Sequence, residues 1–331
     1  MSSTSTCALV ALASTQVDRE TSRDACLAVL AEHSKSFALA GRLLPVEARR
    51  DAAALYAWCR YADDLIDLAS TDEQAHNLAR LERELDAVFA GTPQSRLVLR
   101  AFQEVATERG IPRHYPQELL AGMRMDVEGA RYETLDDLLL YCFRVAGVVG
   151  LMMCHVLGVS DARALSNAAH LGIGMQLTNV CRDVLEDWER GRLYLPGELL
   201  RAAGSPRLDP SPGTSFPESA QLPVARVVER LLALAESYYA SAKQGVAALD
   251  ARSAFAVRTA ALVYSAIGRE LSGRGFDPLS GRAVVSTRSK LLLALRAALL
   301  TLADLPDGAH GPTLPRRGLP LMRYHHDHVP R

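Results

Sequence analysis

The first residues in this chain that could do chemistry form a polar stripe at helical spacing. Tyr56, Arg60, Asp63 and Asp67 are separated by four, three and four positions. At 3.6 residues per turn, this spacing puts all four side chains on one face of a helix. Two carboxylates one turn apart repel each other unless a cation lies between them. The stripe therefore indicates a bound metal ion or a basic partner.

A second stripe farther along the chain has the same design. Gln176, Asn179, Asp183 and Asp187 are separated by three, four and four positions. Carboxylates and amide carbonyls make an oxygen-only ligand set, which suits a hard cation such as Mg²⁺ that completes its shell with substrate phosphate. Neither stripe has a His or Cys at ligand spacing, so zinc is disfavoured.

Either stripe alone is also consistent with an ordinary solvated helix face. Two stripes, each with polar companions in phase and apolar neighbours, instead favour two helices that face each other across a helical bundle. Such a pair would enclose a cavity with Mg²⁺ at its mouth, and the expected ligand is a diphosphate attached to an apolar group. Arg60 and Arg182 could bind the diphosphate oxygens, although an ion pair with nearby acids is an equal interpretation of Arg182.

An almost wholly apolar segment at 141–153 has helical patterning but contains Gly147 and Gly150. Glycine costs a helix about 1 kcal/mol relative to alanine. Its presence indicates either close helix packing or space left for a ligand chain. We expect this segment to form an apolar wall of the cavity or, equally, part of an ordinary core.

The elements that must position these residues are helices. Hydrophobic residues make up 49% of the chain and aromatic residues only 6%, and this mainly aliphatic content favours helices over strands. We predict an all-α fold with a single domain at 20–303 and flexible tails at 1–19 and 304–331. The stretch 204–223, rich in Pro, Ser and Gly, interrupts the helices as a linker, an insertion or a mobile lid.

The overall composition excludes several functional classes. Lys and Arg number 37 against 38 Asp and Glu, and the resulting net charge of −1 provides no positive field to hold nucleic acid. The six cysteines show no CxxC pair and no disulfide framework, so we expect reduced thiols. The N-terminal residues do not read as a secretory signal, and the longest purely apolar run is too short to span a membrane. These features predict a cytoplasmic protein.

The residues around both stripes resemble the squalene and phytoene synthase family, whose members join two isoprenyl diphosphates head to head. The resemblance covers most of the chain, from about His33 to Leu291, and is strongest to the bacterial phytoene synthases. The motifs that carry it are HSKSF at 33–37, YAWCRYADDLID at 56–67, the stretch 125–132, the apolar segment 141–153, and the residues from 176 to 187 followed by GRLYLP at 191–196.

The resemblance implies an isoprenoid synthase fold, a helical bundle with a central apolar cavity. It also implies that Mg²⁺, with Mn²⁺ as a substitute, bridges both acidic motifs to the substrate diphosphates. The implied metal ligands are Asp63, Asp67, Asn179 and Asp183. The implied catalytic residues are Asp63, Asp67, Asp183, Asp187, which closes the second motif, and Tyr264, which matches a tyrosine beside the reacting centre. The implied substrate-binding residues are Ser34, Ser36, Tyr56, Arg60, Tyr141, Gln176, Arg182 and Arg282, and Lys290 matches a further basic position near the entrance.

The implied activity is that of a prenyl-group transferase of the 15-cis-phytoene synthase type. Two geranylgeranyl diphosphates condense through prephytoene diphosphate to phytoene with loss of two diphosphates, the first committed step of carotenoid biosynthesis. No dinucleotide-binding fingerprint follows a predicted strand, so no NADPH is expected. Gly41, one helical turn from Phe37, leaves a gap where C30-producing relatives tend to carry a bulkier side chain, and this favours a C20 donor.

Three alternatives stay open at this point. A squalene or dehydrosqualene synthase that uses farnesyl diphosphate shares the same metal machinery. A head-to-tail prenyl elongase or a terpene cyclase shares aspartate-rich helices but does not account for Ser34 or the segment 56–60. A non-catalytic helical scaffold of the same ancestry is expected to have eroded acidic motifs, whereas both motifs are intact here.

The expected partners are a prenyl diphosphate substrate and a membrane surface. Because the substrate is amphiphilic and the product partitions into lipid, we expect peripheral membrane contact through an amphipathic helix at 291–302. A core helix is the equal alternative for this segment.

Overall fold

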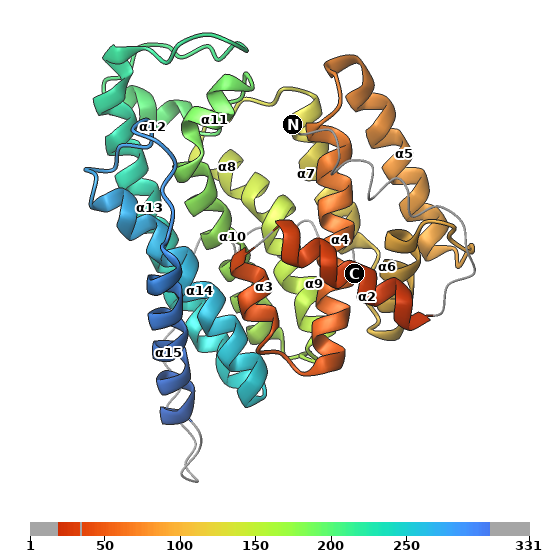
Figure 1. The fold of residues 1–331 in the computed structure, drawn as a ribbon. Helices are drawn as coiled ribbons and strands as arrows, with labels where there is room; N and C mark the ends of the chain where they lie inside the picture. The colour runs from red at the N-terminus through yellow and green to blue at the C-terminus, as the bar shows by residue number, and fades with distance from the viewer. Residues whose placement is uncertain (1–18, 34, 305–331) are drawn as a thin grey trace.

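The computed structural model describes residues 19–33 and 35–304, without the side chains of 19–21 and 35–37, and these residues form helices and no β-strand (Figure 1). The all-α prediction is confirmed. The helices are α2 (Arg19–His33), α3 (Lys35–Gly41), α4 (Val46–Asp67), α5 (Thr71–Phe89), α6 (Leu97–Glu108), α7 (His114–Val127), α8 (Leu135–Cys142), α9 (Val148–Val156), α10 (Ala162–Arg182), α11 (Val184–Glu189), α12 (Gly197–Ala202), α13 (Gln221–Gly245), α14 (Ala251–Ser272) and α15 (Thr287–Ala303). Short irregular turns are η1 (Phe143–Gly147, a π-turn), η2 (Glu218–Ala220) and η3 (Val246–Ala248).

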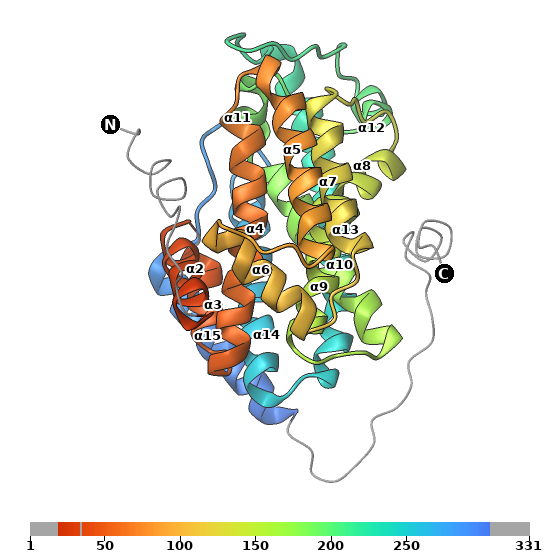
Figure 2. The same cartoon turned by 90° about the vertical axis from the view of Figure 1, so that its right-hand side faces the viewer.

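Helix α10 is the axis of the bundle. It packs along α13 and also contacts α9, η1 and α14. Figure 1 shows α13, α14 and α15 along one side of α10 and the helices from α4 to α7 along the other. Turned by 90°, α4, α5 and α7 run alongside one another, and the end of α4 lies near α11 at one end of the bundle (Figure 2). The two predicted acidic stripes therefore come from opposite sides and meet at that end.

The helix that carries the first stripe has well-defined ends. Pro45 directly precedes α4, where its fixed φ suits a helix start. After α4 ends at Asp67, Ser70 and Glu73 form a capping box that begins α5. This tight connection fixes the carboxyl end of α4, where the aspartates lie.

A buried ionic cluster anchors α4 near its other end. Asp51 is fully buried and accepts hydrogen bonds from Arg23 Nη1 at 2.8 Å and from Arg109 Nε at 2.7 Å. Arg23 also binds Glu108 at 2.5 Å. The cluster holds α4 against α2 and the end of α6, because a buried carboxylate is stable only when its charge is compensated.

The apolar segment at 141–153 is helical but not uniform. It contains the end of α8, the π-turn η1 and the first part of α9. A Cβ on Gly150 would lie 2.3 Å from the Ala168 carbonyl oxygen, and a Cβ on Gly172 would lie 2.2 Å from the Ala146 carbonyl oxygen. Neither distance is tolerable, so these glycines are required for the close approach of α9 and η1 to α10.

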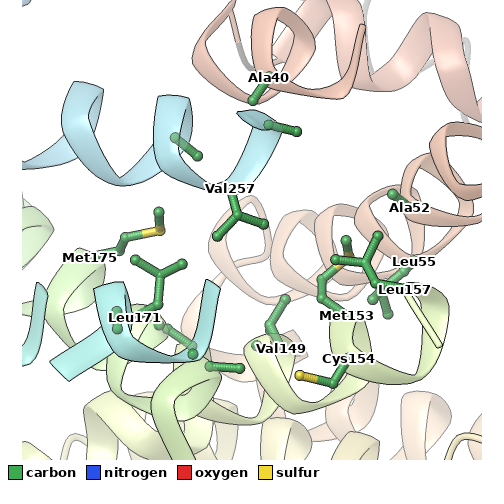
Figure 3. Close-up of a pocket in the computed structure, with 18 of the residues that line it drawn as sticks. Ala40, Ala52, Leu55, Val149, Met153, Cys154, Leu157, Leu171, Met175 and Val257 are labelled. Carbon is green, nitrogen blue, oxygen red and sulfur yellow. The ribbon is translucent and has the colours of Figure 1, made fainter. Parts of the chain in front are cut away.

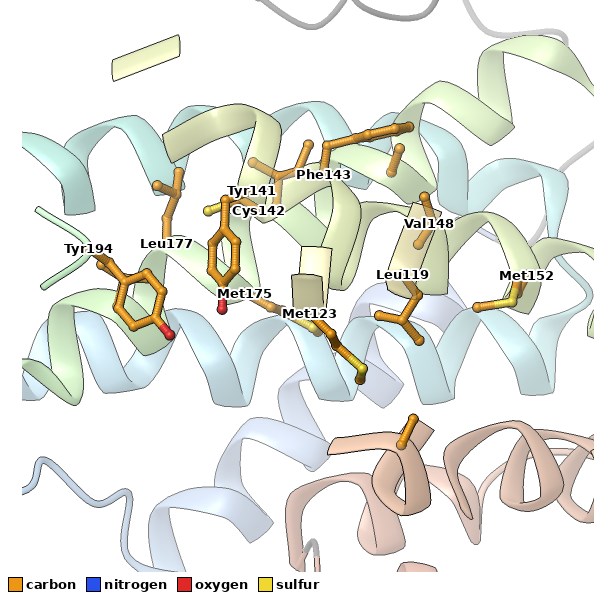
Figure 4. Packing of buried hydrophobic residues seen from close by; sticks show 14 of the residues in the cluster. Leu119, Met123, Tyr141, Cys142, Phe143, Val148, Met152, Met175, Leu177 and Tyr194 are labelled. Atoms are coloured by element: carbon orange, nitrogen blue, oxygen red, sulfur yellow. The ribbon is translucent and has the colours of Figure 1, made fainter. Parts of the chain in front are cut away.

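The longer stretch Leu135–Val156 corrects one expectation. By length and composition its 22 residues are sufficient to cross a membrane, although its longest uninterrupted apolar run is too short to do so. Of its most apolar window, 56% is buried inside the protein. Figure 4 shows Tyr141, Phe143, Val148 and Met152 from this stretch packed among other buried side chains. This burial is typical of a core helix in a large helical bundle.

The stretch 204–223 connects α12 to α13 and ends earlier than predicted, because η2 and α13 already begin at Glu218 and Gln221. Pro223 lies in the first turn of α13, where a missing N–H is tolerated. The stretch packs against the end of α11: Trp188 Nε1 donates to the Thr214 carbonyl oxygen at 2.8 Å, and the Trp188 and Phe216 rings lie 4.8 Å apart.

Candidate active site

A cavity of about 380 Å³ lies between α10 and the helices on either side of it. Figure 3 shows Ala52, Leu55, Met153, Leu171 and Val257 among the side chains around it. The walls are almost entirely apolar and come from α2, α3, α4, α9, α10, α13 and α14. The size and the lining suit a hydrocarbon ligand.

Apart from Asn167 near the start of α10, the amide and tyrosine side chains of the cavity lie close to the two stripes. Tyr56 of α4, Gln176 and Asn179 of α10, and Tyr264 of α14 all line it. Asn179 Nδ2 donates to Gln176 Oε1 at 3.2 Å, whereas Asn179 Oδ1 is buried and has no hydrogen-bond partner. A buried, unpaired carbonyl oxygen is costly and is typical of a site that binds a ligand. This polar end of the cavity therefore adjoins both stripes, since Asn179 precedes Asp183 by about one helical turn and Tyr56 precedes Asp63 by about two.

The first stripe lies at the carboxyl end of α4, as predicted. Arg60 binds Asp64 at 2.5 Å and lies 3.5 Å from Asp63. Partial burial, reinforced by the charge of Asp67, raises the pKa of Asp63 to about 7. The ionised form of Asp63 would therefore be stabilised by a cation bound beside it.

The second stripe differs from the prediction in one respect. It does not lie on a single regular helix, because α10 ends at Arg182 and α11 begins at Val184, with Asp183 at the bend. The hydrogen bonds that would continue the helix persist: Asp183 N–H donates to Asn179 O at 2.9 Å and Asp187 N–H to Asp183 O at 2.8 Å. Because these hydrogen bonds continue across Asp183, the polar side chains of the stripe keep the order expected on a continuous helix. Burial and the neighbouring Asp183 raise the pKa of Asp187 to about 7.

Arginines connect the acidic groups. Arg192, in the loop after α11, donates from Nη1 to Asp67 Oδ1 at 2.8 Å and so joins the second motif to the first. Arg182 forms a hydrogen-bonded ion pair with Asp183. Arg282, in the loop before α15, lies 3.3 Å from both Asp183 and Glu186. The mouth of the cavity is thus a cluster of alternating acids and arginines, which suits a polyanion bound through metal ions and guanidinium groups.

Sequence reasoning missed a carboxylate between the two stripes. Asp126 of α7 accepts hydrogen bonds from Tyr194 OH at 2.8 Å and from Tyr141 OH at 3.0 Å. The two tyrosine rings are stacked with their centroids 4.9 Å apart, and Figure 4 shows both hydroxyls directed to the same side. Burial raises the pKa of Asp126 to about 6, although Arg192 and the tyrosines oppose this change. The only available signal was its place in the matched stretch 125–132.

The donor set fits a hard cation. In the part of the chain that the structure describes, no three His, Cys, Asp or Glu side chains are grouped closely enough to hold a metal ion by themselves. The unpaired Asn179 oxygen and the carboxylates of Asp63 and Asp187, whose pKa values are raised by burial and by a neighbouring aspartate, nevertheless are oxygen ligands that a bound cation would stabilise. Such ligands suit Mg²⁺ or Mn²⁺.

The structure brings most of the predicted site residues to the mouth. These are Tyr56, Arg60, Asp63, Asp67, Gln176, Asn179, Arg182, Asp183, Asp187, Tyr264 and Arg282. Tyr141 is 5% exposed and contacts Asp126 rather than the cavity wall. Ser34 lies outside the described residues, as does the side chain of Ser36, and Lys290 lies on α15.

The position of Gly41 agrees with its predicted effect on the cavity. Gly41 lines the cavity beside Leu30, and an added Cβ would lie 3.5 Å from Leu30 Cδ2. A larger side chain at this position would extend beyond that contact and take space from the cavity.

Comparison with known proteins identifies the family. The family model described as squalene/phytoene synthase matches residues 30–290. A 15-cis-phytoene synthase from Pantoea ananas is 40% identical over 278 residues, covering 81% of this chain and 88% of that protein. A 15-cis-phytoene synthase from Paracoccus sp. is 38% identical, covering 90% of this chain and 96% of that protein.

Solved structures agree with the fold. A dehydrosqualene synthase crystallised with a ligand is 28% identical and superimposes with a TM-score of 0.77 over 86% of this chain and 98% of that chain. A squalene synthase from Alicyclobacillus acidocaldarius has a TM-score of 0.70 over 80% of this chain and 98% of that chain, at 23% identity.

Proposed function

The chain belongs to the squalene/phytoene synthase family, and we propose that it is a phytoene synthase that condenses two molecules of geranylgeranyl diphosphate. The observation that carries this conclusion is an apolar cavity that opens directly at two acidic motifs joined by arginines. Such a site matches a ligand with a hydrocarbon chain and a diphosphate head. Its all-α architecture is that of the isoprenoid synthases.

The C30 synthases fit less well as an alternative. Their solved structures share the fold at 28% and 23% identity, whereas curated bacterial phytoene synthases reach 40% over most of the chain. The open space beside Gly41 supports the longer substrate.

We propose that Asp63, Asp67, Asn179 and Asp183 hold Mg²⁺ ions. When bound, Mg²⁺ offsets the negative charge of the diphosphate and makes it a better leaving group. The unpaired Asn179 oxygen supports this set of ligands. Arg60, Arg182 and Arg282 stand around the same carboxylates and can donate hydrogen bonds to the remaining phosphate oxygens.

The reaction needs no outside oxidant or reductant. Loss of diphosphate from the first molecule leaves an allylic cation, which the 2,3 double bond of the second molecule attacks. Loss of a proton closes the cyclopropane of prephytoene diphosphate. Loss of the second diphosphate, rearrangement and loss of a second proton give phytoene.

The cavity protects these cations. Its apolar walls exclude water, which would quench either cation. Tyr56 and Tyr264 line the cavity near the mouth, and their electron-rich rings suit the stabilisation of a passing positive charge.

Product analysis tests this function. The purified protein is incubated without NADPH, with either geranylgeranyl diphosphate or farnesyl diphosphate, and with either Mg²⁺ or EDTA. The molecular mass of the hydrocarbon product is then measured by mass spectrometry. We expect phytoene from the C20 substrate only when Mg²⁺ is present. A clear preference for farnesyl diphosphate would contradict the phytoene assignment.

We also propose that the protein works in the cytoplasm at a membrane surface, docked through α15. The exposed Leu292, Leu295, Leu299 and Leu302 follow one another at intervals of three, four and three residues and therefore form a stripe on one face. Exposed basic residues at 288 and 296 lie along the same helix, which suits anionic lipid headgroups. Only Ala297 and Thr301 of α15 are buried, which argues against the core-helix alternative. The five described cysteines are free thiols, in keeping with a reducing compartment.

Flotation with liposomes tests the docking. We expect the protein to float with vesicles that contain anionic lipid, and the double variant Leu295→Glu with Leu299→Glu to remain at the bottom of the gradient. The matched control is Leu222→Glu, because Leu222 is equally exposed but lies on α13. Flotation of the double variant at the level of the wild type would exclude α15 as the docking element.

A further inference from the structure

The loop after α11 carries the arginine that joins the two acidic motifs. Arg192 Nη1 lies 2.8 Å from Asp67 Oδ1, although the two residues are 125 positions apart in the chain. The Arg192 side chain is 19% exposed. Nearby Arg190 also approaches Asp67, but its distance is 3.5 Å and its side chain is 60% exposed. Arg192 is therefore the closer and more enclosed partner of Asp67.

The loop is built to hold Arg192 in this position. The Arg192 N–H donates to the Asp187 carbonyl oxygen at 2.8 Å. Gly191 has a φ of +75°, which favours glycine, and a Cβ there would lie 2.9 Å from Pro212 Cδ in the stretch between α12 and α13. Two positions later, Tyr194 is fixed by its hydrogen bond to Asp126. The backbone on both sides of Arg192 is therefore constrained by neighbouring elements.

The charge of Arg192 acts on more than one carboxylate. It interacts with Asp67 and Asp126, and it opposes the rise in the pKa of Asp187. These residues come from α4, α7 and α11, so a single guanidinium compensates acids of three helices. Asp67, however, is also a proposed metal ligand. A cation that binds Asp67 must compete with Arg192 for the same carboxylate.

Diphosphate resolves this competition. A guanidinium displaced from a carboxylate loses a charge-assisted hydrogen bond, and a phosphate oxygen can replace that bond. The metal and the diphosphate then each remove the obstacle to binding the other. Two ligands that favour the same state of a protein bind with positive coupling, and the coupling is reciprocal.

We propose that Arg192 pairs with Asp67 in the ligand-free protein and transfers to the substrate diphosphate when a divalent cation takes Asp67, so that metal and diphosphate bind cooperatively. This inference rests on the proposed function in two respects, the diphosphate ligand and Asp67 as a metal ligand. The enzyme would then bind metal only weakly when no substrate is present. When metal and substrate bind together, the diphosphate leaving group would gain a contact with the Arg192 guanidinium.

Calorimetric titration of the full-length protein tests the proposal without measuring turnover. Three affinities are determined for the wild type and for Arg192→Met: Mn²⁺ alone, inorganic pyrophosphate alone, and pyrophosphate in the presence of Mn²⁺. In the wild type we expect Mn²⁺ to strengthen pyrophosphate binding by about five- to 150-fold, the usual range of coupling between sites. In Arg192→Met we expect Mn²⁺ alone to bind more tightly and the coupling to fall severalfold.

Two further variants keep the result interpretable. Arg192→Lys retains the charge but not the forked donor, and we expect it to restore part of the coupling. Arg190→Met removes the more exposed arginine, and we expect it to change the three affinities less than Arg192→Met does. A thermal melt confirms that each variant is folded. If Arg192→Met does not fold, the coupling measured for Arg192→Lys is compared with that of the wild type instead.

The proposal is overturned if Arg192→Met binds Mn²⁺ no more tightly than the wild type, or if the coupling is unchanged. Because the probes are Mn²⁺ and pyrophosphate, neither result depends on which prenyl chain is the substrate. A failure of the phytoene assay with intact coupling would instead contradict the proposed function alone.

Discussion

Helix α4 carries two groups of carboxylates that are treated in opposite ways. Near its start, Asp51 is fully buried between Arg23 and Arg109, at hydrogen-bond distances of 2.8 and 2.7 Å. At its end, Asp63 and Asp67 stand at the mouth of the cavity, where the Asp63 side chain is 51% exposed and Asp67 shares Arg192 with other acids.

The difference separates a carboxylate that stabilises the fold from carboxylates that are available to bind a ligand. A buried carboxylate with two fixed guanidinium partners holds helices together and cannot exchange its partners cheaply. The carboxylates at the mouth have no such fixed pair of partners, and burial together with the neighbouring Asp67 raises the pKa of Asp63. Only the second group retains capacity to bind a cation from solution.

The largest expected effect comes from a substitution among the carboxylates at the mouth of the cavity. We expect Asp63→Asn to reduce Mg²⁺-dependent turnover by at least about 10³-fold, since a metal ligand supports several kcal/mol of charge stabilisation in the transition state. The melting temperature should be retained, because the change also removes repulsion from Asp67. Steady-state kinetics and calorimetry measure both quantities, with Asp86→Asn on α5 as a control. Turnover near that of the wild type would remove Asp63 from the metal site.

The next largest effect comes from a substitution in the buried Asp51 cluster. Asp51→Asn leaves the positive charges of Arg23 and Arg109 uncompensated, and we expect it to destabilise the protein by about 3–5 kcal/mol. Turnover per folded molecule should change little, since Asp51 lies outside the cavity lining. Urea denaturation followed by circular dichroism gives the free energy of unfolding. If stability were unaffected and turnover lost, the distinction between the two groups would be wrong.

A third variant tests the part of α4 between the two groups. Ala52 follows Asp51 but faces the cavity (Figure 3). Ala52→Phe fills space needed by the hydrocarbon chain, and we expect kcat/KM for C20 relative to C15 diphosphate to fall by about 10- to 100-fold. Ala52→Ser is the size-matched control. An unchanged ratio in a folded Phe variant would mean that the chain does not reach this depth.

The smallest effect is expected for an exposed ion pair that, like the Asp51 cluster, joins an arginine to an aspartate. Arg113 binds Asp86 at 2.6 Å, but the side chains are 48% and 62% exposed. We expect Arg113→Ala to change the free energy of unfolding by less than about 1 kcal/mol. A loss comparable to that of Asp51→Asn would show that burial is not what distinguishes the Asp51 cluster.

Local sequence patterns are sufficient to predict the helices and both stripes. The spacing of Tyr56, Arg60, Asp63 and Asp67 needs only the period of a helix, and α4 has that period throughout. The break at Asp183 was not predicted, because the amino-acid pattern continues across it while the Asp183 backbone, with φ −101° and ψ 15°, leaves helical geometry.

Pairing between distant elements was not predictable from spacing. Asp126 becomes part of the site only because α7 lies beside the loop that carries Tyr194, and Arg192 reaches Asp67 only because α11 ends beside α4. Both residues belong to matched motifs, but a motif in one sequence does not show which partner a charged side chain meets after folding. The roles of Ser34 and Ser36 stay predictions.

The wide turn η1 has a consequence for how this protein can change over evolutionary time. A π-turn accommodates one residue more than an α-helical turn, and each residue of a helix corresponds to a rotation of about 100°. Deleting one residue between 143 and 147 would therefore turn η1 into an ordinary α-helical turn and leave Val149 and Met153 in the cavity wall. A single-codon deletion within α9 would instead rotate the residues that follow it by about 100°, so η1 is the place where this wall can lose a residue without being redirected.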